Sequence, residues 1–237
     1  MKLALLTTET IHHCLFVDQV LSQFNFKIII IERKIIKPPF STHYDLEAKS
    51  ISYEKSLIKS KKYSLKEYAK TIIVDTINDQ QVVTTLLANK IDVVVVFGTS
   101  FIKSDLINKF AGRAVNLHGG DPEKYRGLDS HFWAIYHSDF NSLATTLHLL
   151  DSGLDTGHIV LKWNISLQEV TDLHQLRATN TLLCARLFIT SMLHYAVFGK
   201  FDSYKQRELG RYYSFMPSEL KALCAYKFYT HIQRIKA

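Results

Sequence analysis

Residues 114–127 read AVNLHGGDPEKYRG, and the organisation of the chain can be worked out from this stretch. Its apolar start predicts a short buried strand, and the glycines and proline that follow predict an exposed loop at the strand's end. Asn116 and His118 are two residues apart, so on a strand both side chains project from the same face. An amide donor beside an imidazole, which titrates near neutral pH, combines hydrogen bonding with acid–base chemistry.

A second polar stretch, residues 150–157, reads LDSGLDTG and comes after a predicted helix and strand. It places a carboxylate, Asp155, in a loop bracketed by glycines, where the backbone can approach a ligand closely. The runs on either side, residues 145–150 and 158–166, are predicted to be antiparallel strands. An isolated Asn-x-His pair most simply caps the local backbone, so a catalytic interpretation depends on the motifs that accompany it.

Before these motifs, the chain alternates strands and helices. A strand over residues 2–7, a helix over 11–24 and an isoleucine-rich strand over 27–32 predict a Rossmann-like opening. It has no Gly-x-Gly-x-x-Gly motif, so no classical dinucleotide site is predicted. Residues 91–97 form the clearest buried parallel strand. Residues 98–100 follow it at the carboxyl edge, where open α/β sheets bind their ligands.

The rest of the chain completes an α/β pattern. Residues 42–70 are polar and helix-prone, which predicts a solvated helical insertion, and residues 171–197 predict a long amphipathic helix. The tyrosine-rich residues 210–217 predict a turn or hairpin, and a last helix follows. We therefore expect a Rossmann-like, mostly parallel twisted sheet with helices on both faces. The predicted units are a catalytic domain over residues 1–168 and a small helix, hairpin and helix over residues 169–237.

The composition is that of an ordinary globular protein with a buried core, since 47% of the 237 residues are hydrophobic and 22% are charged. No apolar run reaches the length of a membrane span, and the first six residues fit a strand better than a signal peptide. Cys14, Cys184 and Cys224 are widely spaced, which predicts neither a disulfide framework nor a metal site. Reduced thiols in a cytoplasm are the simplest interpretation.

The formal net charge of +7 has three explanations: a nucleic-acid partner, a negatively charged small substrate, or a solvated surface. The lysines of residues 49–66 and 221–236 are scattered rather than gathered beside aromatic stacking partners. We therefore expect no nucleic-acid partner, and a nucleotide diphosphate fits the charge without one.

Three motifs in this order carry a resemblance: Asn-x-His, the Lys-Tyr-Arg-Gly of residues 124–127, and the Gly-Leu-Asp-Thr-Gly of residues 153–157. Together they resemble the formyltransferases that use 10-formyltetrahydrofolate. That family includes glycinamide ribonucleotide formyltransferase, the catalytic domain of methionyl-tRNA formyltransferase and the sugar nucleotide N-formyltransferases. The similarity covers roughly the first two thirds of the chain. The loop after His118 departs from the common small-Leu-Leu-Pro and reads GGDPE. Together with the GLDSH of residues 127–131, this version looks most like the enzymes that formylate a 4-amino-4,6-dideoxyhexose on a nucleotide.

The resemblance implies roles for particular residues. Asn116 and His118 would donate hydrogen bonds to the formyl oxygen as it becomes an oxyanion, and His118 would also move protons. Asp155 would orient His118 and relay the proton lost by the amine. The backbone of four residues would hold the pterin: Ser100, Ile102, Leu150 and Asp151. The acceptor would be bound by Thr10, His12, His13, Lys124, Tyr125 and Arg126.

Some of these positions also have purely structural interpretations. His12 and His13 could equally lie on a helix surface, whereas at a helix amino end they could bind the sugar or its phosphates. Asp151 could be a turn residue. Trp133 and Tyr136, at helical spacing, fit core positions. Residues 212–215 could be a dimer contact or a platform on which the nucleotide base stacks, and we favour the contact of a homodimer.

The reaction that the resemblance implies is transfer of a formyl group to the 4-amino group of a nucleotide-linked 4-amino-4,6-dideoxyhexose, for a surface polysaccharide such as O-antigen. The first candidate acceptor is dTDP-4-amino-4,6-dideoxyglucose and the second is GDP-perosamine. Methionyl-tRNA is a third, although too few residues remain for the basic carboxyl-terminal domain of that family. A non-catalytic folate-binding protein is the alternative from another class, and the Asn116, His118 and Asp155 set argues against it. The sequence leaves the base and the sugar configuration open.

Overall fold

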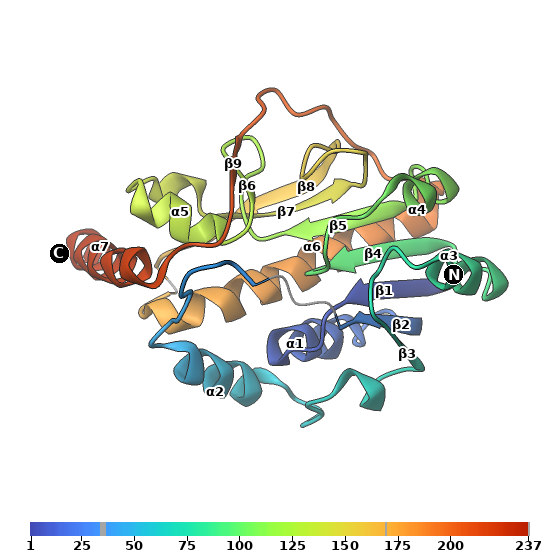
Figure 1. Cartoon of the computed structure of the whole chain (residues 1–237), viewed down its shortest axis with the longest axis horizontal. Coiled ribbons are helices and arrows are strands. Elements are labelled where there is room, and N and C mark those ends of the chain that lie inside the picture. Colours follow the sequence, from blue (N-terminus) through green and yellow to red (C-terminus); the bar gives the residue numbers. More distant parts are fainter. Residues whose placement is uncertain (34–36, 169, 237) are drawn as a thin grey trace.

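A seven-stranded sheet forms the centre of the protein, in the order β3-β2-β1-β4-β5-β7-β8 (Figure 1). The computed structural model describes residues 1–33, 37–168 and 170–236. The strands are β1 (Leu3–Thr7), β2 (Phe26–Glu32), β3 (Thr71–Val74), β4 (Val93–Phe97), β5 (Ala114–His118), β7 (Ala144–Leu149) and β8 (Ile159–Asn164). The first five are parallel, and β7 and β8 are antiparallel to their neighbours. The predicted mostly parallel α/β fold is confirmed.

Helices cover both faces of the sheet, as predicted. On one face lie α1 (Ile11–Val20), α2 (Glu47–Leu57) and α6 (Leu176–Phe198); on the other lie α3 (Gln80–Ala88) and α4 (Ser104–Lys109). Strand β1 shows why two helical layers are needed: Leu3 and Leu5 pack into one core, and Ala4 and Leu6 into the other. A strand buried on both faces must be apolar at every position, and all five residues of β1 are buried.

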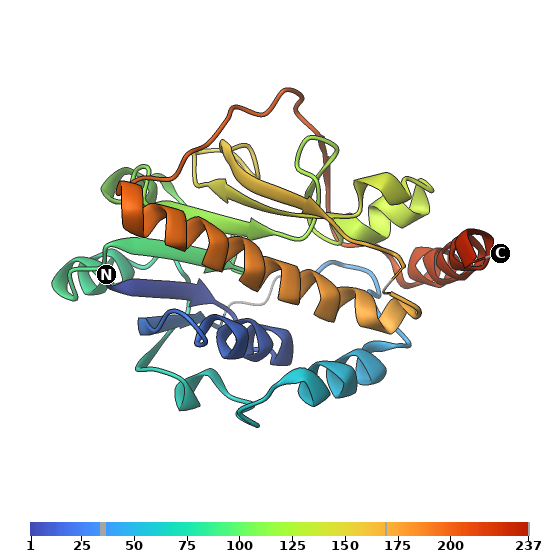
Figure 2. The same cartoon turned by 180° about the vertical axis from the view of Figure 1, so that it is seen from behind.

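Helix α6 is the longest element and crosses the back of the sheet (Figure 2). A short 3-10 helix (Leu173–Gln175), capped by the Asp172 side chain, precedes it, so α6 begins later than the sequence predicted. It ends at Gly199, whose φ of 68° is the left-handed conformation expected of a glycine stop. By length and composition this region is apolar enough to cross a membrane. Here it packs on α1, β7 and β8.

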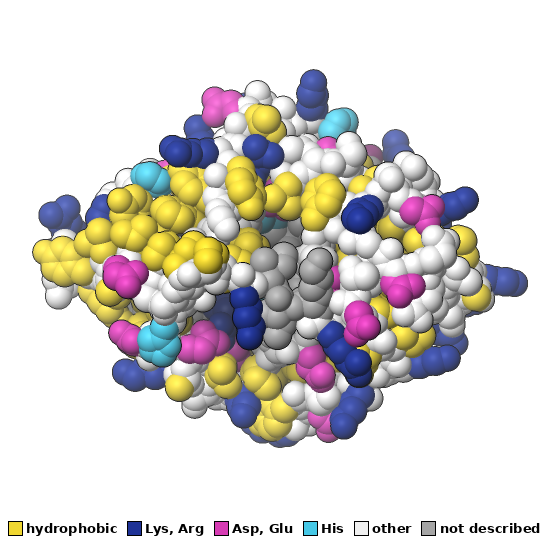
Figure 3. Space-filling model, viewed as in Figure 1, with side chains coloured by type: hydrophobic (Ala, Val, Ile, Leu, Met, Phe, Trp, Pro, Cys, Tyr) yellow, Lys and Arg dark blue, Asp and Glu magenta, His cyan; other side chains and the backbone are white. Residues whose placement is uncertain are grey.

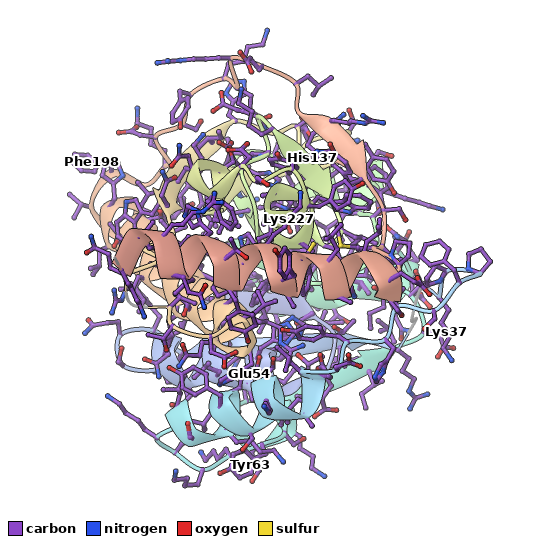
Figure 4. All side chains as sticks on the ribbon, turned by 90° about the vertical axis from the view of Figure 1, so that its left-hand side faces the viewer. Lys37, Glu54, Tyr63, His137, Phe198 and Lys227 are labelled. Carbon is purple, nitrogen blue, oxygen red and sulfur yellow. The ribbon has the colours of Figure 1, made fainter. Side chains whose placement is uncertain are left out.

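Helix α2 forms within the predicted helical insertion and is mostly solvated, with only Ser50 and Glu54 buried. It is anchored to the body of the protein at one of these residues. Glu54 of α2 is fully buried, and the guanidinium of Arg177 on α6 binds it. Arg177 also donates to both carboxylate oxygens of Glu47, at 2.8 and 2.9 Å. Burial raises the pKa of Glu54, and the hydrogen bonds and charge of Arg177 oppose that rise. Figure 4 shows Glu54 on the side of α2 that faces the body of the molecule.

The carboxyl-terminal segment does not form the predicted hairpin. Strand β9 (Arg211–Tyr213) pairs in parallel with β6 (Tyr125–Gly127), which comes directly after the loop that follows His118. The N–H of Gly210 donates to Pro122 O at 3.2 Å, and that of Arg211 to Lys124 O at 3.0 Å. The last helix, α7 (Ser218–Lys236), packs on α5 (Ser130–Tyr136) over a third, smaller core. Glu169 and Ala237, the ends of the predicted carboxyl-terminal unit, lie outside the described residues.

Candidate active site

The carboxyl end of β5 brings Asn116 and His118 to the edge of the parallel part of the sheet. Strand β7 runs antiparallel beside it, and its register pairs Asn116 with His148 and His118 with Thr146. Paired residues on neighbouring strands project from the same face, so the register brings a second imidazole to Asn116. His148 was not predicted to be a site residue. It is an imidazole in a short buried strand whose other polar residues are Thr145 and Thr146.

Asp155 lies in the loop between β7 and β8 and contacts all three of these side chains. Its Oδ2 is 3.5 Å from His118 Nδ1, and its Oδ1 is 3.4 Å from His148 Nε2. Asn116 Nδ2 donates to Asp155 Oδ1 at 3.3 Å and lies 3.0 Å from His148 Nε2. The structure therefore brings together the three residues predicted to be catalytic and adds His148 to them. His118, His148 and Asp155 are all buried.

Hydrogen bonds to the backbone fix how the two imidazoles face the carboxylate. His118 Nε2 donates to Tyr125 O at 2.9 Å, and His148 Nδ1 donates to Leu149 O at 2.8 Å. The other nitrogen of each ring therefore faces Asp155. Burial alone would raise the pKa of the Asp155 carboxyl, but the charge of His118, hydrogen bonding and charge from His148 and the N–H of Gly127 outweigh it. They hold this pKa well below its usual range, so Asp155 stays ionised.

Two glycines allow this packing. A Cβ on Gly120 would lie 2.7 Å from His118 Nε2, and one on Gly157 would lie 1.7 Å from Leu149 O. Both distances are shorter than van der Waals contact, so a side chain at either position would push the catalytic groups apart. Gly120 and Gly157 thus let the backbone pack directly against His118 and against Leu149 beside His148.

A cavity of about 330 Å³ opens beside the cluster. It lies between the loop after β4 and the loop after β7, with Asn116, His118, His148 and Asp155 in its wall. The four residues predicted to hold the pterin differ in what they offer. The N–H and hydroxyl of Ser100 both donate to Glu32 at 2.7 Å, and the Asp151 carboxylate accepts from Gly153 N and Thr156 Oγ1.

Ile102 and Leu150 offer backbone groups instead. Within residues 1–33, 37–168 and 170–236, the N–H and C=O of Ile102 and the C=O of Leu150 have no hydrogen-bond partner. Asp151 acts as a turn residue whose carboxylate closes its own loop, the alternative that the sequence left open for it. The backbone groups at positions 102 and 150 are therefore those that a flat heteroaromatic ligand could reach.

Residues at the start of α1 line the same cavity from the other side. Thr10 caps the helix by accepting from His13 N at 3.3 Å, and its hydroxyl lies 3.0 Å from His12 Nδ1. His13 Nδ1 donates to Thr8 O at 2.6 Å. Burial lowers the pKa of His13 to about 4, despite the opposing bond to Thr8, and lowers that of His12 well below its usual value. Both rings are neutral at neutral pH, so they can give a phosphate hydrogen bonds but no positive charge.

The residues after the GGDPE loop make contacts within the protein. Lys124 forms an exposed ion pair with Glu208 at 3.0 Å. Tyr125 is buried, and its hydroxyl donates to Asp139 at 3.2 Å. Arg126 donates to Leu154 O at 3.1 Å and to Gly210 O at 2.6 Å. The loop's own Asp121 and Glu123 bind Lys162 of β8. The assignment of Lys124, Tyr125 and Arg126 to substrate binding thus stays a prediction. In the structure, all three side chains bind other parts of the protein.

A second cavity, of about 520 Å³, lies on the other side of His118. The two cavities share four lining residues, which are His118, Gly119, Gly127 and Leu128. The lining of the second includes Tyr44 before α2, Glu47 of α2, Arg177 and Asn180 of α6, and Lys221 of α7. His118 thus stands where two spaces of ligand size meet, an arrangement suited to a reaction between two substrates.

In the described part of the chain, no group of three or more His, Cys, Asp or Glu residues is placed to hold a metal ion. Cys14, Cys184 and Cys224 are all buried and unbridged. On the face shown in Figure 3, Lys and Arg side chains are spread around the molecule rather than gathered into one patch.

Comparison with known proteins shows which family the chain resembles in sequence. A model of the formyl transferase family matches residues 48–183, more than half of the chain. The methionyl-tRNA formyltransferase of Gloeothece citriformis (strain PCC 7424) is 34% identical over 79 residues. That match covers 33% of this chain and 23% of the length of the relative.

Solved structures match over more of the chain. A 4-N formyltransferase from Francisella tularensis has a TM-score of 0.60 at 14% identity and covers 96% of this chain and 87% of that one. The formyltransferase PseJ from Anoxybacillus kamchatkensis, in complex with UDP-4,6-dideoxy-4-formamido-L-AltNAc and tetrahydrofolate, has a TM-score of 0.52 at 18% identity. It covers 90% of this chain and 86% of that one. At these identities, the matches show a common fold.

Proposed function

Because the chain belongs to the formyl transferase family, we propose that it transfers a formyl group from 10-formyltetrahydrofolate to the 4-amino group of a nucleotide-linked 4-amino-4,6-dideoxyhexose. One observation carries the proposal: His118, Asn116 and Asp155 form a single buried cluster at the meeting point of two cavities. The first candidate acceptor is dTDP-4-amino-4,6-dideoxyglucose, and the second is GDP-perosamine. The formamido sugar nucleotide would be made in the cytoplasm and used in the synthesis of a surface polysaccharide such as O-antigen.

In the proposed reaction the acceptor amine is the nucleophile, so no covalent bond to the enzyme is needed. The amine nitrogen attacks the formyl carbon, and the formyl oxygen takes up negative charge. The bond from the formyl carbon to N10 of the folate then breaks. The proton lost by the amine passes through the His118–Asp155 pair to N10, which leaves as the amine of tetrahydrofolate. The N–H groups of Asn116 and His118, which face Asp155 and Tyr125 O in the ligand-free structure, would turn to the formyl oxygen and stabilise its charge.

The 330 Å³ cavity is proposed for the folate, because it presents the free backbone groups of Ile102 and Leu150. The 520 Å³ cavity, whose lining includes Asn180, Lys221 and the paired Arg177 and Glu47, is then available to the acceptor sugar. His12 and His13 line the cavity proposed for the folate, so their assignment to the acceptor stays a prediction. Tyr212 lines the folate cavity and is exposed, while its neighbour Tyr213 stacks on Trp133. This placement favours stacking of the Tyr212 ring on the ligand of that cavity over a contact between subunits. The homodimer through residues 212–215 stays a prediction.

Glu32 should control folate binding, because it holds the loop that follows β4. This buried carboxylate accepts from Ile77 N at 2.9 Å and from the N–H and hydroxyl of Ser100. Glu32→Gln places an amide donor among these three donors, and a lost bond to a charged group costs about 1.5–3 kcal/mol. We expect KM for 10-formyltetrahydrofolate to rise about 10-fold or more with little change in kcat.

Asp18 provides the matched control for this measurement. Its carboxylate also holds a loop through two backbone N–H groups, those of Lys59 and Ser60, away from both cavities. Asp18→Asn should leave KM for the folate unchanged. Equal effects of the two substitutions would mean that Glu32 acts only through general stability.

The acceptor is tested by offering the enzyme several amines with 10-formyltetrahydrofolate. Methionyl-tRNA must be among them, because curated relatives that match this chain in sequence are methionyl-tRNA formyltransferases. We expect turnover on a 4-amino sugar nucleotide, fastest with the dTDP-linked glucose-configured sugar, and none on methionyl-tRNA. Formylation of methionyl-tRNA with no reaction of any amino sugar nucleotide would contradict the proposal and identify methionyl-tRNA as the acceptor. Mass spectrometry of the products distinguishes the two results.

A further inference from the structure

A segment near the carboxyl terminus lies against the loop that carries Asp155. Residues 205–213, here called the C-terminal strap, follow α6 and lie beyond the residues that the family model matches. From the end of α6 the chain passes over β7 and β8 and comes down as β9 beside β6 (Figures 1 and 2). The strap therefore brings distant residues to the centre of the site.

One strap side chain binds the Asp155 loop directly. Gln206 Nε2 donates to Asp155 O at 2.8 Å and to Gly157 O at 2.9 Å, so both of its amide hydrogens are used on this loop. Arg126 links the two segments a second time, by donating to Leu154 O of the loop and to Gly210 O of the strap. Three carbonyl groups of the Asp155 loop, those of Leu154, Asp155 and Gly157, are thus held by side-chain donors from outside it.

The loop needs to be held, because Asp155 has an unfavourable backbone conformation. Its φ is +53°, in the left-handed region that a residue with a side chain rarely adopts. Such conformations cost on the order of 1–3 kcal/mol and persist only where the surroundings impose them. This conformation directs the carboxylate toward His118, where Gly127 N also donates to it at 2.8 Å. Gly127 itself belongs to β6, which pairs with strap residue Tyr213.

We propose that Gln206, carried by the C-terminal strap, is the positioning residue of the active site that holds Asp155 so that its carboxylate faces His118 and Asn116. This inference rests on the proposed function only through the requirement for Asp155 in formyl transfer. Gln206 does not touch the reacting atoms. It acts on the rate through the geometry of the carboxylate.

The strap also makes contacts that have no connection with Asp155, and these supply a control. Glu208 pairs with Lys124 at 3.0 Å on the exposed side of the strap. Glu208→Gln removes this ion pair and leaves Gln206 in place, so it should change neither turnover nor the Asp155 loop. A strap that served the fold alone would respond to both substitutions in the same way.

The test compares Gln206→Ala and Gln206→Glu with Glu208→Gln in the full-length protein. Gln206→Glu keeps the shape but replaces the amide donors with a carboxylate that faces two carbonyl oxygens. We expect both Gln206 variants to lose about 10- to 100-fold in kcat, with little change in either KM, because misplacing a catalytic group costs turnover. The acidic limb of their pH–rate profiles should move to lower pH, because a displaced Asp155 carboxylate no longer places its negative charge beside His118.

Hydrogen exchange of the ligand-free protein gives a readout that does not depend on the acceptor. Amides of residues 150–158 should exchange faster in Gln206→Ala than in the wild type, at unchanged melting temperature. Unchanged exchange, or the same loss of kcat in Glu208→Gln, would overturn the inference. A wild-type protein that formylates no amino sugar nucleotide would refute the proposed acceptor instead, and the exchange measurement would still decide the role of the strap.

Discussion

Asn116→Ala is expected to lower kcat by a factor of about 10²–10³, the cost typical of losing one preorganised donor to an oxyanion. Asn116 Nδ2 is the amide donor of the cluster, and in the ligand-free structure Asp155 and His148 hold it in place. The formyl oxygen gains its charge during the reaction, so the lost stabilisation should appear in kcat rather than in the KM of either substrate. The measurement is steady-state release of tetrahydrofolate.

Asn164→Ala is the matched control, since Asn164 is an exposed asparagine at the end of β8, outside both cavities. It should turn over at the wild-type rate. His118→Ala should lose at least as much activity as Asn116→Ala, because His118 supplies both a donor and an acid–base group. Near-normal turnover in Asn116→Ala or His118→Ala, with both substrates saturating, would show that the substituted residue is not catalytic.

Asp155→Asn should lower turnover by about 10²-fold or more and also change its pH dependence. The charge of His118 helps to hold the pKa of Asp155 below its usual range, so Asp155 is ionised over the whole working range. Asparagine keeps the shape without the negative charge, and a cluster that has lost a negative charge binds a proton less tightly.

The sign of the shift follows from this loss of charge. Turnover must rise from acidic to neutral pH, because a protonated cluster cannot accept the proton of the attacking amine. Without the carboxylate, the proton leaves at lower pH, and the acidic limb of kcat should move to lower pH in Asp155→Asn. A lower but unshifted profile would show that the carboxylate positions groups without tuning them. An acidic limb that is unchanged in His118→Asn would show that His118 does not accept the proton of the amine.

Local rules predicted the parts of the site that lie along one strand or in one loop. The two-residue spacing of Asn116 and His118 placed them on one face, and the structure confirms their placement. Asp155 came from the motif of residues 153–157, through its resemblance to a family. His148 was missed because its proximity to Asn116 depends on the register of β5 against β7, and one strand read alone does not contain that register.

Longer-range contacts explain what was predicted wrongly or not at all. The tyrosine-rich residues 210–217 have the turn chemistry of a hairpin, but β9 finds its partner in β6, more than 80 residues earlier in the chain. The charged residues of α2 predicted a solvated helix, and most of α2 is solvated, but the buried pairing of Glu54 with Arg177 depends on a residue far along the chain. Gln206 carried no signal, because its amide gains a role only when the strap reaches the Asp155 loop.

The central claim is that the cluster around His118 moves a formyl group from folate to the amine of a nucleotide-linked sugar. The most direct measurement supplies 10-formyltetrahydrofolate labelled with carbon-13 in the formyl group, together with dTDP-4-amino-4,6-dideoxyglucose, and follows the label by NMR. The wild-type protein should place the label in a formamide on the 4-amino nitrogen, and Asp155→Asn should lose nearly all of this transfer. Label that stays on the folate with every amino sugar nucleotide, or that appears on methionyl-tRNA instead, would contradict the claim.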